Sequence, residues 1–224
     1  MTGPTPTWLH QALSAARFGP YVASSGGDVE RASRLYQWNV EVSAAFYVPL
    51  HWLEIALRNA LNERLRAAYG REDWWDRAPL VQGGRTKVDQ ALKNARRNSR
   101  REGSRSFAPD DVVAELSFGF WVGLLSRKND RTFWVPILHQ AFNGYNGRRD
   151  DLHRDLLSMV LFRNRVMHYE PIHHRDLEKD RHTTYRLLEY IGPELAGQVR
   201  RHDRVPAVLA GRNDACAGDH APGL

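Results

Sequence analysis

The chain lacks both the cysteines of a disulfide-rich protein and the long apolar runs of a membrane protein. Its single cysteine, Cys216, excludes an intramolecular disulfide and a zinc site with two thiolate ligands. No run of eighteen or more consecutive apolar residues occurs, so we expect no transmembrane helix. Residues 1–6 contain neither the basic nor the apolar region of a secretory signal. These absences predict a cytoplasmic protein.

The alternation of apolar and polar residues that is typical of a half-buried β-strand is missing as well, and no internal repeat occurs. Apolar residues recur instead at helical spacing, for example at Leu50, Leu53, Leu57 and Leu61. A hydrophobic content of 42% in 224 residues is sufficient for one substantial core. We therefore predict an all-α bundle of about seven to nine helices, formed by residues 7–210 as one domain. Residues 1–6 and the Gly-rich stretch 211–224 are expected to be disordered.

Glycine and proline predict where several helices end. We expect Gly19-Pro20 to end a first helix, and Pro49 to break or kink the path between a second and a third helix. Residues 112–125 are apolar on most sides and predict one buried central helix. Pro171 is expected to end the helix that starts near residue 150, because proline lacks an N–H and disfavours helical geometry at the preceding residue.

Positive charge exceeds negative charge, with 32 Lys and Arg against 26 Asp and Glu, a net charge of +6 and a pI of about 9.7. Much of the excess lies in residues 85–107, which predict a basic helix followed by a loop. Such a strip either contacts phosphates in a salt-sensitive, sequence-independent way or is simply solvated, and both interpretations stay open. As an RNA-binding strip it consists of Arg85, Lys87, Lys93, Arg96, Arg97, Arg100, Arg101 and Arg105.

The most informative stretch is residues 162–172, in which Arg163 and Asn164 are followed by His168. On a helix from about 150 to 168, Asn164 and His168 are four residues apart and share one face. Arg163 falls near the middle of an apolar stripe, where a guanidinium is expensive unless it is paired or faces a cleft. The stripe consists of Leu152, Leu156, Met159, Val160, Val166 and Met167.

Two interpretations of this stretch stay open. In the structural one, Arg163 pairs with a carboxylate inside a helical core and His168 only caps the end of a helix. Glu54 is the carboxylate that we would test, although with Arg58 it can equally form an ordinary surface ion pair. In the functional one, Arg163, Asn164 and His168 form a catalytic site.

A metal site is the less favoured chemistry for this region. His168, His173, His174 and Glu170 are close in sequence. However, His168 and His173 are five residues apart with Pro171 between them, which does not match the two-histidine helical zinc motif. No nucleophile elbow is present either. We therefore expect no metal and no other cofactor.

Arginine, asparagine and histidine together can act on a phosphodiester. Cleaving RNA without a metal requires a base for the 2′-OH, an acid for the leaving 5′-oxygen and positive charge on the phosphorane. A histidine can serve as base or acid near neutral pH, and an arginine presents a planar fork to phosphate oxygens. Asn164 can orient His168 or the 2′-OH. One His168 cannot easily be base and acid at once, so we expect two copies to face each other across a twofold axis.

Arg163-Asn164 and His168, followed by Glu170-Pro171-Ile172, resemble the signature of HEPN-domain proteins, and more specifically of the bacterial abortive-infection (Abi-like) branch. Three further blocks and His174-Arg175-Asp176-Leu177 extend the resemblance over about residues 8–210 in the same order. The three blocks are Leu35-Tyr36-Gln37-Trp38-Asn39, residues 50–59 (LHWLEIALRN) and residues 115–122 (ELSFGFWV). Where many relatives have a second histidine after the motif histidine, this chain has Tyr169.

The resemblance implies a helical bundle that dimerises, so that two Arg-x4–6-His motifs share one composite cleft. It also implies a metal-independent endoribonuclease that acts as a toxin in phage defence. Arg163 and His168 would be the catalytic pair, with Asn164 beside them. Separately from the resemblance, we expect Glu54, Arg58, Tyr169 and Glu170 to be supporting residues of the site. RNA, a second copy of the chain and an antitoxin or regulatory RNA are the expected partners, and no membrane is expected. The alternative is a non-catalytic HEPN module that binds RNA or protein.

Overall fold

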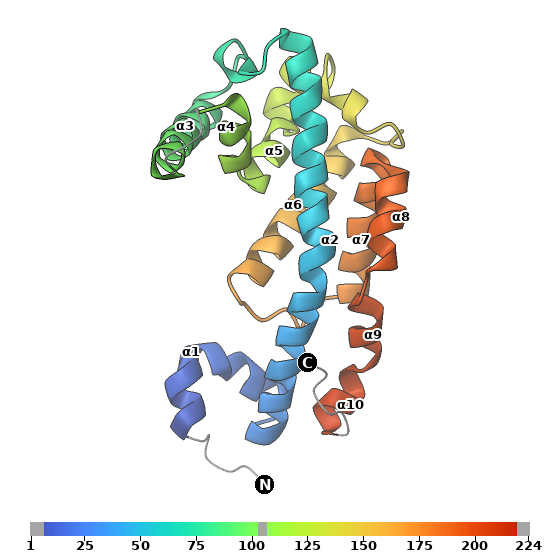
Figure 1. Ribbon diagram of the computed structural model, residues 1–224. Coiled ribbons are helices and arrows are strands. Elements are labelled where there is room, and N and C mark those ends of the chain that lie inside the picture. Colours follow the sequence, from blue (N-terminus) through green and yellow to red (C-terminus); the bar gives the residue numbers. More distant parts are fainter. Residues whose placement is uncertain (1–6, 103–106, 219–224) are drawn as a thin grey trace. The chain divides into compact units, whose positions relative to one another are not determined.

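The structure is a computed structural model and describes residues 7–102 and 107–218 (Figure 1). Within these residues every regular element is a helix, so the all-α class predicted from the sequence is confirmed. The described chain contains ten α-helices, beside an expectation of about seven to nine. The number is higher because the C-terminal stretch forms two six-residue helices, α9 (Val205–Ala210) and α10 (Arg212–Ala217).

Contacts divide the chain into two compact units. Unit 1 consists of Met1–His51, Leu161–Tyr185 and Gly197–Leu224, and unit 2 consists of Trp52–Val160 and Arg186–Ala196. Four helices contribute residues to both units: α2 (Val29–Tyr69), α6 (Arg149–Met167), α7 (Leu177–Ile191) and α8 (Pro193–Arg201). The predicted domain 7–210 thus includes most of both units.

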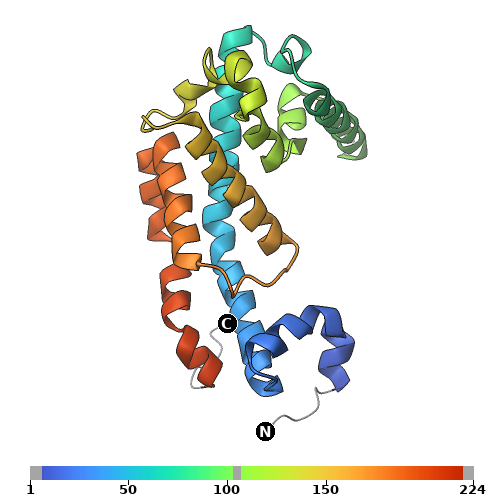
Figure 2. The same cartoon turned by 180° about the vertical axis from the view of Figure 1, so that it is seen from behind.

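Unit 1 has an aromatic core. Tyr21 of α1 (Thr7–Ser24) packs edge-on against Tyr36 of α2, with ring centroids 5.1 Å apart. Phe46 of α2 packs edge-on against Phe162 of α6 at 4.8 Å. Trp38 is buried and its indole N–H donates to the carbonyl oxygen of Val208 in α9 at 3.0 Å. Figure 2 shows α1 beside the first turns of α2.

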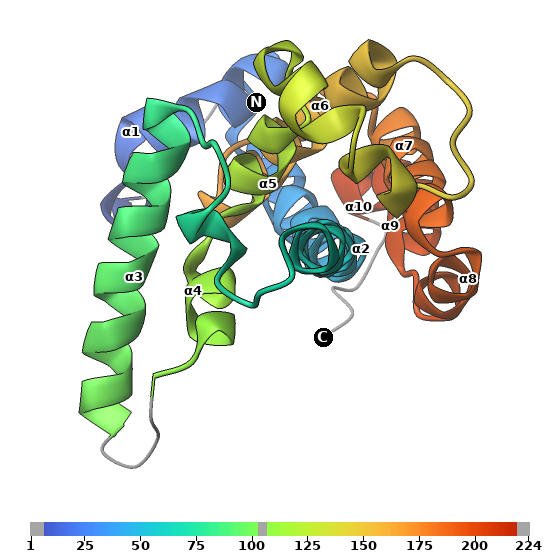
Figure 3. The same ribbon diagram turned by 90° about the horizontal axis from the view of Figure 1, so that it is seen from above.

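Unit 2 is built around tryptophans. Trp74 of the 3-10 turn η1 (Trp74–Asp76) lies 6.1 Å from Trp121 of α5 (Phe118–Leu124), measured between ring centroids. Its indole N–H donates to the side-chain oxygen of buried Asn62 at 2.9 Å, so this buried donor and this buried acceptor satisfy each other. The helices α3 (Gln82–Glu102) and α4 (Pro109–Glu115) lie side by side (Figure 3).

Two of the predicted helix ends are wrong. The first helix does not stop at Gly19-Pro20 but continues to Ser24, and its break lies at Ser14, where φ is 58°. Pro49 lies inside α2 and does not end it. In both cases a proline removes one helical hydrogen bond, while buried residues on either side of it keep the helix packed. These flanking residues are Phe18 and Tyr21 around Pro20, and Phe46 and Leu50 around Pro49.

The single central helix predicted for residues 112–125 is also wrong, because α4 and α5 are separate. The chain is extended at Leu116, where ψ is 120°. Ser117 then caps α5, and its hydroxyl accepts a hydrogen bond from the Phe120 N–H at 3.3 Å. The following stretch is not a regular helix but three short turns, η2 (Arg127–Asn129), the π-type η3 (Asp130–Trp134) and η4 (Leu138–Ala141).

Residues 212–217 form α10 and are not the disordered tail that the sequence predicted. Two arginines attach this helix to other parts of unit 1. The Arg212 guanidinium lies over the Trp38 ring at 4.8 Å and donates to the His173 carbonyl oxygen at 3.1 Å, while Arg34 donates to the Cys216 carbonyl oxygen at 3.0 Å. The expectations for residues 1–6 and 219–224 concern residues that the structure does not describe.

Over one 18-residue window, α2 has a mean hydropathy of 1.2, and by length and composition it could cross a membrane. The buried core helix of a soluble protein has the same composition, and 39% of this window is buried. The cytoplasmic location expected from the sequence stays a prediction.

Candidate functional site

The predicted catalytic residues lie in the last turn of α6. Phe162 and Val166 are buried and fix this turn, with Phe162 packed between Phe46 and the Arg175 guanidinium, which lies 4.9 Å from the Phe162 ring centroid. Asn164 and His168 are exposed, and Arg163 is partly exposed. The His168 N–H donates to the Asn164 carbonyl oxygen at 2.9 Å, so both residues share one face, as the spacing predicted.

The helix ends at Met167, close to the expected end near residue 168 and four residues before Pro171. Tyr169 adopts a left-handed backbone conformation with φ of 58°. Its N–H donates to the Val166 carbonyl oxygen at 3.2 Å, and the Glu170 N–H donates to the Arg165 carbonyl oxygen at 2.9 Å. These two bonds form a Schellman cap, in which the left-handed position is usually a glycine. Tyrosine at this position is strained by about 1–2 kcal/mol, directly after His168.

Arg17 of α1 forms a hydrogen bond with the backbone of the strained residue, Tyr169. Its Nη1 donates to the Tyr169 carbonyl oxygen at 2.7 Å, across 152 residues of sequence. The Tyr169 side chain itself is 76% exposed. The backbone that follows His168 is therefore fixed on both sides, by the cap within α6 and by a cation from α1.

The segment after the cap is attached to α2 through Asn39. The Asn39 side-chain oxygen accepts hydrogen bonds from the backbone N–H groups of Ile172, at 2.8 Å, and His173, at 3.1 Å. Asn39 is 3% exposed, and both of its partners are buried. Farther on, Arg175 forms a bidentate pair with Asp180, with two bonds of 2.8 Å. The path from His168 to α7 is thus fixed by polar contacts of good geometry.

His173 is a buried neutral histidine and does not belong to the exposed face of the motif. One ring nitrogen, Nε2, lies 2.9 Å from the Ser24 hydroxyl oxygen, and the ring lies 4.9 Å from that of Tyr21. Burial, followed by the nearby charges of His174 and Arg212, lowers the pKa of His173 to about 4. Among the described residues, no group of three or more His, Cys, Asp or Glu side chains could hold a metal ion.

The predicted site residues are divided between the two units. Tyr169 and Glu170 belong to unit 1 with Arg163, Asn164 and His168. Glu54 and Arg58 belong to unit 2, both are partly exposed, and the Arg58 Nε donates to the Asn59 side chain at 3.3 Å. A Glu54–Arg163 pair stays a prediction.

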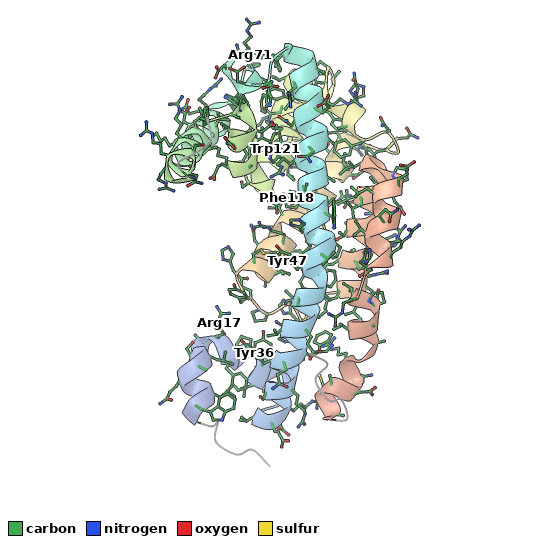
Figure 4. All side chains as sticks on the ribbon, in the orientation of Figure 1. Arg17, Tyr36, Tyr47, Arg71, Phe118 and Trp121 are labelled. Atoms are coloured by element: carbon green, nitrogen blue, oxygen red, sulfur yellow. The ribbon has the colours of Figure 1, made fainter. Side chains whose placement is uncertain are left out.

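An apolar cavity of about 730 Å³ adjoins the motif in unit 1. Figure 4 labels three of its residues, Arg17 on α1 and Tyr36 and Tyr47 on α2. Two polar side chains of its wall have partners, because Ser43 donates to the Asn39 carbonyl oxygen at 2.7 Å and Arg17 donates to the Tyr169 carbonyl oxygen. The remaining wall is formed by Val40, Ala44, Val166, Met167 and Tyr169.

The basic strip lies on α3, which continues as a helix to Glu102. Val88, Ala91 and Ala95 form its buried face. Arg85 is engaged structurally, because its guanidinium donates to the carbonyl oxygens of Trp75, at 2.6 Å, and Ala78, at 3.0 Å. The Arg101 side chain and all of Arg105 lie outside what the structure describes. The basic residues that remain exposed on the helix are Lys87, Lys93, Arg96, Arg97 and Arg100.

Sequence reasoning missed two residues that position the motif. The sequence did indicate that Asn39 could have a buried role, because it is a polar residue beside the apolar positions Trp38 and Val42 of the same helix. It held no such indication for Arg17, because a single arginine on a short helix does not indicate a partner 152 residues away.

Compared with models of known protein families, with curated proteins and with solved structures, the chain has no match. The resemblance to HEPN-domain proteins therefore rests on the residues quoted above.

Proposed function

We propose that the protein is a metal-independent endoribonuclease of the HEPN type, with Arg163, Asn164 and His168 as its catalytic residues. The observation that carries the proposal is the exposed face formed by Asn164 and His168 at the end of α6, with partly exposed Arg163 beside them. The His168 side chain is therefore accessible to a substrate, whereas that of His173 is buried. The strained backbone of Tyr169 next to His168 also favours a functional site, since such strain concentrates there.

In this proposal, Arg163 binds a nonbridging oxygen of the scissile phosphate and stabilises the charge of the phosphorane. His168 takes the proton from the 2′-OH or gives one to the leaving 5′-oxygen. Asn164 orients the 2′-OH or the imidazole. The second proton transfer comes from His168 of a second copy, so the active form is a homodimer. The resemblance favours a role as a toxin in anti-phage abortive infection, restrained by an antitoxin or a regulatory RNA.

Cleavage of total cellular RNA by the purified protein in EDTA tests the proposal. We expect fragments that end in a 2′,3′-cyclic phosphate, and we expect none from His168→Ala. His182→Ala is the matched control, because His182 is exposed in the same unit and lies outside the motif. It should cleave as the wild type does.

Two outcomes would count against this mechanism. If cleavage required an added divalent metal, the proposed metal-independent acid–base mechanism would be wrong. Intact RNA with both proteins, together with RNA binding, would favour the non-catalytic RNA-binding module.

The second candidate is a non-catalytic module that binds a protein, and the apolar cavity of about 730 Å³ beside the motif favours it. Exposed Val40 and Tyr47 at this cavity offer an apolar surface of the kind that binding partners use. Tyr47→Glu should abolish partner capture if this candidate is correct. It should leave RNA cleavage by the isolated protein unchanged if the nuclease proposal is correct.

A further inference from the structure

Unit 2 contains a cationic cavity of about 640 Å³ beside the first turn of α6. Five basic residues and two aspartates line it, which gives a formal charge of +3. The wall contains no histidine, cysteine or hydroxyl side chain. A cavity of this kind is suited to holding an anion.

One of the five cations, Arg149, is part of the scaffold. Its side chain is 8% exposed. Its Nη1 donates to the Leu125 carbonyl oxygen at 2.7 Å, its Nε pairs with Asp130 at 2.8 Å, and its Nη2 pairs with Asp150. Both carboxylates of the cavity are therefore already engaged by the one arginine that cannot reach a ligand freely.

The other four cations are exposed at the cavity: Arg127, Lys128, Arg131 and Arg148. None of these four side chains forms an ion pair within residues 7–102 and 107–218. Like charges brought this close repel one another and lower stability unless an anion is bound. A contribution to the stability of the fold therefore does not explain why these four cations lie together without acidic partners, whereas binding of an anionic ligand does.

The backbone that carries these cations is held in place. The amide nitrogen of buried Asn129 donates to the Gly123 carbonyl oxygen at 2.9 Å, and this bond fixes the turn η2 after α5. The Tyr145 hydroxyl donates to the Arg148 carbonyl oxygen at 2.7 Å, just before α6 begins. A cationic site on fixed backbone loses less conformational entropy when a ligand binds.

We propose that this cavity binds the phosphate groups of an RNA chain. Arginine forks match phosphate oxygens, and four cations exceed what one phosphate monoester requires, so a chain with several phosphates fits better than a single anion. The choice of RNA as the source of these phosphates rests on the proposed function. The cavity adds a second, non-catalytic contact to the same substrate.

Binding of a fluorescently labelled oligouridine of about 20 nucleotides tests the proposal. The full-length His168→Ala protein is used, so that the RNA stays intact. Arg131→Ala and Arg148→Ala are each expected to weaken binding about 3–10-fold and to reduce the slope of log affinity against log salt by about 0.7. Arg77→Ala is the matched control, because Arg77 is exposed in the same unit and outside the cavity. It should change neither quantity.

Unchanged RNA affinity in both cavity variants would overturn the proposal, even if the wild type cleaves RNA. Weaker binding in both variants would support the cavity, even if the wild type cleaves nothing, so the two proposals fail separately. Calorimetry with a nucleoside triphosphate is the second arm. Triphosphate binding that is lost in Arg131→Ala, with RNA binding unchanged, would overturn RNA as the ligand.

Discussion

The Arg17 guanidinium donates a 2.7 Å hydrogen bond to the carbonyl oxygen of Tyr169, the residue that follows the candidate catalytic His168. Tyr169 is left-handed, with φ of 58°, and its side chain is 76% exposed. The strain at this position is thus maintained by backbone bonds, because the tyrosine ring has little contact with the rest of the protein.

Replacing Tyr169 by glycine should stabilise the protein. Glycine adopts the left-handed conformation without steric strain, although it adds conformational freedom to the unfolded chain. We expect a net gain of about 0.5–1 kcal/mol in the free energy of unfolding, measured by urea denaturation. Tyr169→Ala is the control and should bring no gain, because alanine keeps the steric cost. A less stable Tyr169→Gly would show that the tyrosine ring contributes more than the strain costs.

Asn39→Ala should destabilise the protein by about 2–4 kcal/mol. The substitution removes the acceptor of two buried N–H groups, those of Ile172 and His173. Ser43→Ala is the comparison, because the Ser43 hydroxyl donates only to a carbonyl oxygen of its own helix, and it should cost less than about 0.5 kcal/mol. Equal chemical denaturation midpoints for Asn39→Ala and Ser43→Ala would show that the two hydrogen bonds of the Asn39 side chain do not stabilise the protein as proposed.

His173 should make the protein less stable in acid. Its pKa is about 4 in the folded protein and about 6.5 when unfolded, so between these values the unfolded state binds a proton that the folded state does not. Its contribution is complete above pH 6.5 and is lost as the pH falls toward 4. Between pH 7 and pH 4.5, the free energy of unfolding of His173→Gln should fall by about 2 kcal/mol less than that of the wild type. His182→Gln should follow the wild type, since His182 is exposed.

Arg163→Ala separates the structural from the catalytic interpretation of the motif. Arg163 is partly exposed, so we expect a cost of about 1–2 kcal/mol and a complete loss of RNA cleavage. Arg165 forms only a loose surface pair with Glu170, at 3.7 Å, and Arg165→Ala should cost less than about 0.5 kcal/mol and keep activity. A loss of 3–5 kcal/mol in Arg163→Ala would instead indicate a broken buried pair.

Periodicity was sufficient to predict the helical class and the buried stripe of α6. Leu152, Leu156, Met159 and Val166 are buried as expected, and Arg163 interrupts them. The expected helix end near residue 168 is close to the observed one at Met167, but the left-handed cap at this end was not predictable. A left-handed cap is normally signalled by glycine, and here the position is Tyr169, so the next visible signal was Pro171.

Prolines did not predict helix ends at positions where the neighbouring side chains are buried. Pro20 and Pro49 each lie within a helix whose neighbouring side chains are buried. The free energy of packing these neighbours exceeds the loss of one helical hydrogen bond. The cationic cavity was missed for a different reason. Arg131 and Arg148 are 17 residues apart in an irregular stretch, and no sequence period brings them together.

Unit 1 is formed by segments that are far apart in the sequence, so its parts are synthesised at different times. Its first segment ends at His51, while the segment that carries the motif starts at Leu161. At ribosomal rates, roughly 5–20 s separate the synthesis of these two segments. During that interval Asn39 has no partner, because Ile172 and His173 have not yet been translated. A nascent chain released between these two segments would contain most of unit 2 but neither Arg163 nor His168, so it would lack the proposed site.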